Sequence, residues 1–281
     1  MSGPPGESGL GRRALKDLAG RHGIRPTKAL GQHFLADPNL ARRIAELTGA
    51  GPGDRLLEIG AGLGSLTVAL ADRGAEVLAV ELDRALLSAL QEVVADRGGV
   101  RVLAGDAVRL DWVELLGDGE WRMASNLPYN VAVPVVLRLL EEAPSVRDLV
   151  VMVQREVGER LAASPDDEAY GAVSAKVAYF ADARLLRRIP SSVFWPEPKV
   201  ESVLVRLTPR EPPVSTPRDR LFRVIDEGFA QRRKTMANAL VRLGLDRAAA
   251  ARLLESCGVD IRVRAESLSL EQLACLAEAA G

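Results

Sequence analysis

Between residues 55 and 105, short apolar runs alternate with longer amphipathic stretches, and this alternation limits the possible folds more than any other feature of the chain. RLLEI, EVLAVEL and VRVLAG have the length and composition of buried strands. SLTVALADR and RALLSALQEVVADR carry apolar residues at helical spacing. Alternating strands and helices are typical of a parallel sheet with helices on both faces. The sequence therefore predicts an α/β fold with a doubly wound, Rossmann-like sheet.

Changes in composition divide the chain into three parts. A helix is expected at 133–142, and further strands are expected at 121–125, 148–153, 185–189 and 199–209. TPREPPVSTPRD then places four prolines in twelve residues, which indicates a linker. Beyond it, Leu221, Ile225 and Phe229 begin a helical pattern. We expect a flexible tail with at most one short helix, an α/β domain and a smaller all-α domain, over residues 1–25, 26–208 and 209–281.

Composition restricts the class of protein further. An apolar fraction of 47% with 27% charged residues is that of a globular protein, and no apolar run approaches the roughly 20 residues of a membrane span. The first residues lack the apolar core of a signal peptide. The two cysteines, Cys257 and Cys275, lack the spacing of metal ligands. We therefore expect a cytoplasmic monomer with no metal site and with both thiols free.

The net charge of −1 conceals an uneven distribution, because both flanks of the chain are basic and the centre is acidic. Residues 182–234 alone carry twelve Lys or Arg against seven Asp or Glu. Binding to a polyanion depends on such local patches rather than on net charge. The distribution is compatible with a nucleic-acid partner and equally with ordinary solvated surface charge.

LLEIGAGLGSLT joins the first apolar run to the first amphipathic stretch through a glycine-rich loop that includes Gly60 and Gly62. Glycine allows a cofactor to approach the backbone closely, and the start of a helix offers free N–H groups to a carboxylate. By itself, the motif is equally explained by a tight turn between a strand and a helix.

Acidic residues follow three successive strands of the expected sheet: Glu58, Glu81 and Asp106. Ligands of doubly wound sheets bind at the carboxyl ends of the strands, so these three side chains are expected at one edge. Glu81 is placed to accept hydrogen bonds from ribose hydroxyls, a spacing that fits nicotinamide cofactors equally. Asp106 could accept a hydrogen bond from an adenine amine, whereas Asp83 is interpreted as a helix cap.

The motif Asn126-Leu127-Pro128-Tyr129 favours a methyl-donor cofactor over a nicotinamide cofactor. An aromatic amine is a poor nucleophile, because its lone pair is delocalised into the ring. The side-chain oxygen of Asn126 and the main-chain oxygen of Leu127 could each accept one N–H and direct the lone pair toward a methyl group. Pro128 would stiffen the turn, and Tyr129 would provide a face on which an extracted base stacks. The pattern predicts methyl transfer to an exocyclic adenine amine.

Together these motifs resemble the ribosomal RNA adenine dimethyltransferases of the KsgA type over roughly residues 26–275. The resemblance rests on GQHFL at 31–35, EIGAGLGSLT, VELD, GDA, NLPYN, FWPEPKVESVLVRL and FAQRRKTMANAL. It implies S-adenosylmethionine as the cofactor and the following residues as its contacts: His33, Leu35, Gly60, Gly62, Glu81, Asp106, Ala107 and Asn126. It also implies that Phe194 packs with Tyr129 against the flipped adenine; the alternative is a phenylalanine buried in the core.

RNA that is recognised by shape requires contacts to its phosphates. We expect such contacts from the basic residues of the second half of the chain: Arg187, Arg188, Lys199, Arg218, Arg220, Arg223, Arg232, Arg233 and Lys234. The run from Arg232 to Lys234 is expected to begin a helix of the smaller domain.

The resemblance implies N6,N6-dimethylation of two adjacent adenosines near the 3′ end of 16S ribosomal RNA, within the 30S subunit or its assembly precursor. A first alternative is a methyltransferase of the antibiotic-resistance type that acts on 23S ribosomal RNA. Such relatives share the glycine loop but usually lack the FWPEPKVES and RRKTMANAL forms found here. A second alternative is an RNA-binding assembly factor without turnover, which the intact NLPY disfavours.

Overall fold

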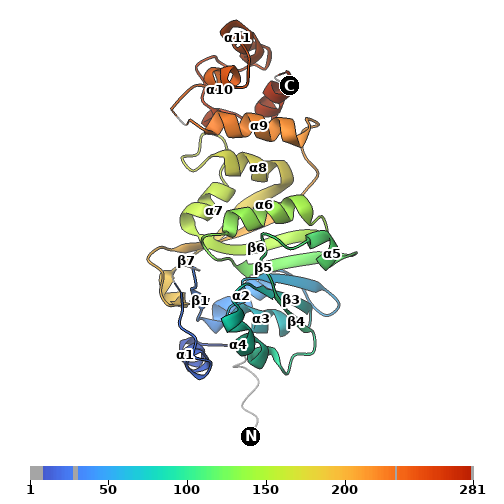
Figure 1. The fold of residues 1–281 in the computed structure, drawn as a ribbon, viewed down its shortest axis with the longest axis vertical. Coiled ribbons are helices and arrows are strands. Elements are labelled where there is room, and N and C mark those ends of the chain that lie inside the picture. The colour runs from blue at the N-terminus through green and yellow to red at the C-terminus, as the bar shows by residue number, and fades with distance from the viewer. Residues whose placement is uncertain (1–8, 28–30, 232, 280–281) are drawn as a thin grey trace. The chain divides into compact units, whose positions relative to one another are not determined.

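The computed structural model describes residues 9–27, 31–231 and 233–279 (Figure 1). The chain forms two compact units. The first runs to Gly158 and continues over Arg184–Thr208, and the second comprises Glu159–Ala183 and the residues from Pro209 onward. Residues 159–183 therefore belong with the helices of the second unit, whereas the sequence placed them in the α/β domain.

A seven-stranded mixed sheet in the order β4-β3-β2-β5-β6-β9-β7 forms the first unit's centre. Its strands are β2 (Arg55–Ile59), β3 (Glu76–Glu81), β4 (Val100–Ala104), β5 (Trp121–Asn126), β6 (Val146–Gln154), β7 (Ala181–Ile189) and β9 (Ser202–Pro209). The strands from β4 to β6 pair in parallel, and β9 pairs with β6 in the antiparallel direction. The predicted doubly wound sheet is confirmed. β1 (Phe34–Leu35) and β8 (Phe194–Trp195) form a separate antiparallel pair.

The helices of this unit are α1 (Arg12–Arg21), α2 (Pro38–Leu47), α3 (Ser65–Ala71), α4 (Arg84–Val94), α5 (Trp112–Leu116) and α6 (Ala132–Glu142); α7 (Arg155–Leu161) runs from the first unit into the second. α3 and α4 connect β2, β3 and β4 in one direction across the sheet, and α5 and α6 accompany the return to β5 and β6. Because crossovers are right-handed, the two groups cover opposite faces (Figure 1). Glu58, Glu81 and Asn126 all end or nearly end their strands at the same edge.

Helix α1 corresponds to the short helix that the sequence allowed around residues 12–19, but it is packed against the α/β core and is not part of a loose tail. Leu15 and Leu18 are buried in a cluster with Phe34, Leu63 and Leu86. The apolar side of α1 therefore covers the glycine loop and α4. A short amphipathic helix is ordered by such packing rather than by its own propensity, so the sequence could indicate the helix but not its place on the core.

The second unit is helical, as predicted for the C-terminal part of the chain. Its further elements are α8 (Ala172–Phe180), α9 (Arg218–Phe229), α10 (Met236–Arg242), α11 (Arg247–Ser256) and α12 (Leu270–Ala279). Tyr170 and Ala175 pack with Leu221 and Leu240 in one hydrophobic core, which explains why residues 159–183 join this unit. The part of the chain that the structure describes also contains short 3-10 helices, η2 (Ser191–Val193) in the first unit and η3 (Ala265–Ser267) in the second. Among the described residues, no helix has both the length and the apolar character needed to cross a bilayer.

The expectation of two free thiols is wrong. Cys257, at the end of α11, and Cys275, on α12, form a disulfide, with their Cα atoms 5.9 Å apart. The two helices contact each other, and this packing brings together residues that are 18 positions apart in the sequence. Spacing alone could not indicate the pair, because a disulfide requires this close approach of the two Cα atoms.

Candidate active site

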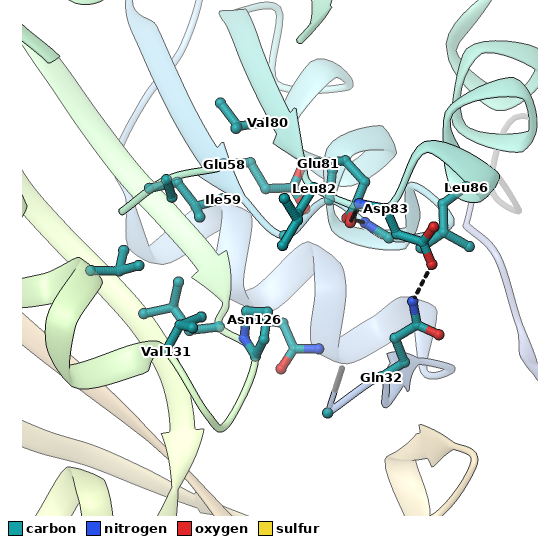
Figure 2. A pocket seen from close by; sticks show the side chains of 18 of the residues that line it. Gln32, Glu58, Ile59, Val80, Glu81, Leu82, Asp83, Leu86, Asn126 and Val131 are labelled. Atoms are coloured by element: carbon teal, nitrogen blue, oxygen red, sulfur yellow. Dashed lines mark hydrogen bonds between the residues drawn. The ribbon is translucent and has the colours of Figure 1, made fainter. Parts of the chain in front are cut away.

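A cleft opens at the carboxyl ends of β2, β3, β4 and β5. Figure 2 shows it from close by, with Glu81 at the end of β3, Asp83 just after β3 and Gln32 approaching from the N-terminal segment. The residues that the sequence singled out and that line it are His33, Leu35, Gly60, Gly62, Glu81, Asp106, Ala107, Asn126, Leu127, Pro128 and Tyr129. Segments far apart in the chain therefore meet at this one edge of the sheet.

The glycine loop lies directly against the NLPY turn and the N-terminal segment. Gly60 and Gly62 have φ of +75° and +59°, a region that other residues rarely adopt. A Cβ at Gly60 would lie 3.0 Å from Pro128 Cδ, and one at Gly62 would lie 3.0 Å from Phe34 Cδ1. Glycine is favoured here by the backbone conformation and by the close approach of Pro128 and Phe34; the close approach of a cofactor stays a prediction.

The Glu81 carboxylate is held by main-chain groups on two sides. The N–H of Gly62 donates to Oε2 at 2.7 Å, and the N–H of Asp83 donates to Oε1 at 2.9 Å. Burial raises the pKa of Glu81, an effect that these two hydrogen bonds oppose. Each carboxylate oxygen has a second lone pair, so Glu81 can still accept hydrogen bonds from ribose hydroxyls.

Asp83 has the capping role that the sequence indicated, together with a contact that it did not. Its Oδ1 accepts from the N–H of Ala85 at the start of α4. Its Oδ2 accepts from the side-chain amide of Gln32 at 2.7 Å, the dashed line in Figure 2. Gln32 Oε1 accepts from the N–H of Thr27 at 2.7 Å, so Gln32 ties the N-terminal segment to the rim of the cleft. The only signal for this role was its place within GQHFL.

Glu58 is a buried acid beside the loop, 1% exposed, and it also lines the cleft. Burial raises the pKa of Glu58 to about 8; a hydrogen bond of 2.5 Å from the Thr67 hydroxyl opposes this rise, and the nearby Glu81 carboxylate reinforces it. A carboxyl with this pKa holds its proton at neutral pH. The sequence showed its position at the strand end, whereas only the fold shows that it is buried.

Asp106 and Ala107 form the part of the rim that follows β4. Asp106 Oδ1 accepts from the N–H of Val108 at 3.0 Å, and its Oδ2 lies 3.4 Å from Arg109 Nε. The side chain of Asp106 is 32% exposed, so its carboxylate remains accessible from the cleft that it lines. The apolar side chains of Leu82 and Val108 line the same cleft, which the sequence did not indicate.

Asn126 is oriented by a hydrogen bond from its side chain to the main chain. Its Nδ2 donates to the carbonyl oxygen of His33 at 2.9 Å. Because a carbonyl can only accept, the amide nitrogen must be the atom on this side, and the amide oxygen is the acceptor that Asn126 retains. The N–H of Leu127 donates to Met152 O at 3.0 Å, and the N–H of Val131 donates to Pro128 O at 3.1 Å, which together fix the turn.

Tyr129 and His33 form a stacked pair at the same side of the cleft. Their ring centroids are 5.4 Å apart with an interplanar angle of 30°. His33 Nδ1 hydrogen-bonds to Pro196 O at 2.7 Å, and the Tyr129 hydroxyl hydrogen-bonds to Ser202 Oγ at 2.9 Å. Burial raises the pKa of the Tyr129 phenol, which keeps it protonated.

Phe194 does not lie where the resemblance implied. Its side chain is 0% exposed and packs in the hydrophobic core with Leu35, Ile44 and Leu204. It is not among the residues that line the cleft, so in this structure it offers no face to a base. The physical reason is the pairing of β8 with β1, in which Phe194 faces Leu35 and is covered by the core.

The basic residues expected at RNA lie away from the cleft lining. Five of them are exposed in regular elements or the segment after β8: Arg187, Arg188, Lys199, Arg220 and Arg223. Arg218 is partly buried and pairs with Asp219 at 3.0 Å. Arg232 lies outside the described residues. Arg233 and Lys234 are exposed in the turn before α10, which begins only at Met236, so the predicted helix start is wrong.

Known proteins resemble the chain over nearly its whole length. Residues 24–280 match the family Ribosomal RNA adenine dimethylase. A Thermobifida fusca (strain YX) protein named Ribosomal RNA small subunit methyltransferase A is 48% identical over 270 residues, which cover 94% of this chain and 93% of that protein. A dimethyladenosine transferase from Plasmodium falciparum has a TM-score of 0.74 at 24% identity, over 87% of this chain and 96% of that chain.

The 23S rRNA methyltransferase ErmE has a TM-score of 0.68 at 23% identity, over 88% of this chain and 98% of that chain. At these identities the two solved structures show a shared fold. The match over residues 24–280 and the relative at 48% identity show the family as well as the fold. The chain belongs to the ribosomal RNA adenine dimethylase family.

Proposed function

We propose that this protein transfers methyl groups from S-adenosylmethionine to N6 of two adjacent adenosines near the 3′ end of 16S ribosomal RNA, placing two methyl groups on each nitrogen. Its substrate is the 30S subunit or its assembly precursor, and it acts in the cytoplasm as a monomer. The family and the small-subunit name of the relative at 48% identity support this reading.

The orientation of Asn126 is the observation that carries the proposal. With its amide nitrogen committed to the His33 carbonyl, Asn126 retains its oxygen as an acceptor at the edge of the cleft. An adenine N6 amine has two N–H groups. If the Asn126 oxygen accepts one and the Leu127 carbonyl accepts the other, the nitrogen is drawn toward tetrahedral geometry and its lone pair is directed out of the ring plane.

The residues of the cleft fit the cofactor. Gly60 and Gly62 line the cleft without side chains, so a cofactor can approach the backbone of the loop closely. Glu81 and Asp106 provide acceptors for the ribose hydroxyls and the adenine amine, and Leu82 and Val108 provide apolar walls for the ring. Leu35, His33 and Ala107 complete the lining at the side of the N-terminal segment and the β4 loop.

The cofactor supplies an electrophilic methyl group on a sulfonium. The N6 lone pair forms the new N–C bond as the C–S bond breaks, and the proton then leaves the weakly basic product nitrogen for water. The protein's part is to orient the amine through Asn126 and Leu127 and to stack the base on Tyr129. Pro128 contributes rigidity, since it has no N–H that could compete for the same acceptors.

The basic residues of the second half of the chain are proposed to contact RNA phosphates. They are Arg187, Arg188, Lys199, Arg218, Arg220, Arg223, Arg232, Arg233 and Lys234. Phosphate contacts position a protein on RNA without reading its sequence, and they make affinity dependent on salt. Replacing one of them is therefore expected to weaken RNA binding and to lower its salt dependence.

Mass mapping of RNA tests the substrate. Unmethylated small subunits and, separately, large subunits are incubated with the protein and labelled S-adenosylmethionine, and the RNA is digested and mapped. We expect N6,N6-dimethyladenosine at two adjacent positions near the 3′ end of 16S RNA and none in 23S RNA. Label in 23S RNA would assign the protein to the large subunit instead, and label in neither would contradict methyl transfer to ribosomal RNA.

A further inference from the structure

Ser202 is a buried hydroxyl whose side chain reaches the tyrosine of the NLPY turn. It is 0% exposed at the start of β9, where it pairs with Gln154 of β6. The N–H of Arg155 donates to Glu201 O at 3.0 Å, which fixes the main chain just before it. Its neighbours Val203 and Leu204 are buried apolar residues. A serine in such a place requires a hydrogen-bond partner, because an unpaired buried hydroxyl is destabilising.

The partner is the hydroxyl of Tyr129, 2.9 Å from Ser202 Oγ. Tyr129 is restrained at two further places. The His33 ring covers one of its faces at 5.4 Å, and the turn that carries it is closed by the hydrogen bond from Val131 N–H to Pro128 O. The ring is therefore held at its tip, on one face and through the backbone.

A base that stacks on Tyr129 takes its orientation from the plane of the phenol ring. Without a bond at the hydroxyl, the tip of the ring could swing about the Cα–Cβ bond and change the direction of the ring's long axis. Rotation about the Cβ–Cγ bond leaves the hydroxyl oxygen in place, so the stacked His33 ring restrains that torsion instead. A change in the orientation of the Tyr129 ring moves the N6 amine of the stacked base away from the Asn126 oxygen. Small misplacements of reacting groups reduce the rate strongly, even when the groups themselves are intact.

We propose that Ser202 is a positioning residue for methyl transfer. Its hydrogen bond to the Tyr129 hydroxyl fixes the tip of the ring, His33 restrains the rotation of the ring, and the target base stacks on the face that His33 leaves uncovered. The proposal rests on the proposed function, in which Tyr129 stacks the extracted adenine. It assigns a role in orientation of the base and none in binding of the cofactor.

The test compares Ser202→Ala, Tyr129→Phe and the double variant with the wild type. Each single change removes the same hydrogen bond, so each is expected to lower kcat on small subunits by roughly 3- to 10-fold. The double variant should lose no more than the larger single effect, because the bond can be lost only once. The cofactor Kd should stay within about twofold of the wild-type value, and Ser202→Thr, which keeps the hydroxyl, should recover most of the rate.

Ser174→Ala is the matched control for general destabilisation. Ser174 is also a buried serine, 1% exposed, and its hydroxyl donates to Arg160 O at 2.6 Å within the helical unit. Its loss should lower the melting temperature without a change in kcat, provided that all variants are assayed well below their melting temperatures.

Three outcomes would overturn the inference. They are a wild-type kcat in Ser202→Ala, multiplicative losses in the double variant, and a loss of cofactor affinity that parallels the loss of rate. Failure of the proposed function would look different, because the wild-type protein itself would then leave 16S RNA unmethylated.

Discussion

The side-chain amide of Asn126 donates a 2.9 Å hydrogen bond to the main-chain carbonyl of His33, a residue 93 positions earlier in the chain. The bond joins the end of β5 to the segment just before β1 and decides which atom of the amide remains available. Because the acceptor is a main-chain group, no substitution at position 33 can remove it directly. The geometry of the site therefore depends on the path of the backbone as well as on the side chains.

Asn126→Asp tests this orientation with almost no change in volume. The carboxylate cannot donate to the His33 carbonyl, so two acceptors would face each other and the side chain would turn away. We expect kcat on small subunits to fall by about 100- to 1000-fold, the range found when one preorganised contact to the reacting group is lost. Asn39→Asp, on the exposed side of α2, is the control and should retain the wild-type rate. A kcat within threefold of wild type in Asn126→Asp would contradict the mechanism.

Glu81→Gln should weaken cofactor binding. The carboxylate accepts from the N–H groups of Gly62 and Asp83 and retains lone pairs for the ribose, whereas an amide offers one oxygen and brings a donor to the other side. We expect the Kd for S-adenosylmethionine, measured by calorimetry, to rise by about 10- to 100-fold, as for loss of one to two charge-assisted hydrogen bonds. Glu76→Gln, at the exposed opposite end of the same strand, should bind as the wild type does. Equal affinities of the two variants would exclude Glu81 from the cofactor site.

Glu58 should make stability depend on pH. Burial raises its pKa from 4.5 to about 8, so between these values the folded protein keeps a proton that the unfolded chain releases. The free energy of unfolding of the cofactor-free protein should therefore decrease as pH rises from about 4.5 to 8, and Glu58 contributes up to roughly 1.4 kcal/mol per pH unit to this decrease. Above pH 8, the contribution of Glu58 should no longer change with pH. Denaturant titrations over pH 5 to 8 measure the slope.

Glu58→Gln removes the titrating proton while retaining the shape of the side chain. The difference in unfolding free energy between variant and wild type should grow in favour of the variant as pH rises through this window. Glu81, whose pKa burial also raises, remains in both proteins; because its carboxylate raises the pKa of Glu58, the difference between the profiles includes this coupling. Parallel pH profiles would show that Glu58 is ionised in the folded state.

Gly60→Ala separates backbone strain from the close approach of the NLPY turn. Gly60 and Gly23 both have positive φ, +75° and +65°, so alanine should cost about 1–2 kcal/mol of stability at either position. Only at Gly60 would the new methyl group meet Pro128, at 3.0 Å, whereas nothing lies within 4 Å at Gly23. We expect Gly60→Ala to lower kcat by about 10- to 100-fold through displacement of the turn, and Gly23→Ala to leave it unchanged. Similar rates in the two variants would refute a role for this contact.

Phe194 should behave as a core residue. Phe194→Ala is expected to reduce the unfolding free energy by about 3–5 kcal/mol, and Phe194→Leu by less than about 1.5 kcal/mol. Because the side chain is enclosed beneath β8, the rate per folded molecule of Phe194→Leu should match the wild type at saturating substrate. A large loss of rate in this well-folded variant would mean that Phe194 leaves the core to reach the base, as the family resemblance implies.

The sequence by itself determined the doubly wound sheet, the helical C-terminal part and most residues of the cleft. It could do so because strand and helix periodicities are local, and because parallel strands bring their carboxyl ends to one edge; Glu58, Glu81 and Asn126 follow from that rule alone. The glycine loop was equally readable, since positive φ restricts the choice of residue wherever it occurs.

Only the tertiary structure decided which groups contact one another across the sequence. Segments that no local pattern relates are joined by the hydrogen bonds from Asn126 to His33 and from Tyr129 to Ser202, and by the disulfide between Cys257 and Cys275. The burial of Phe194 likewise depends on packing between distant segments. The assignment of residues 159–183 to the helical unit has the same origin. Hydrogen bonds and packing depend on distances of a few tenths of an ångström between chain segments, and the one-dimensional order of residues carries no such distances.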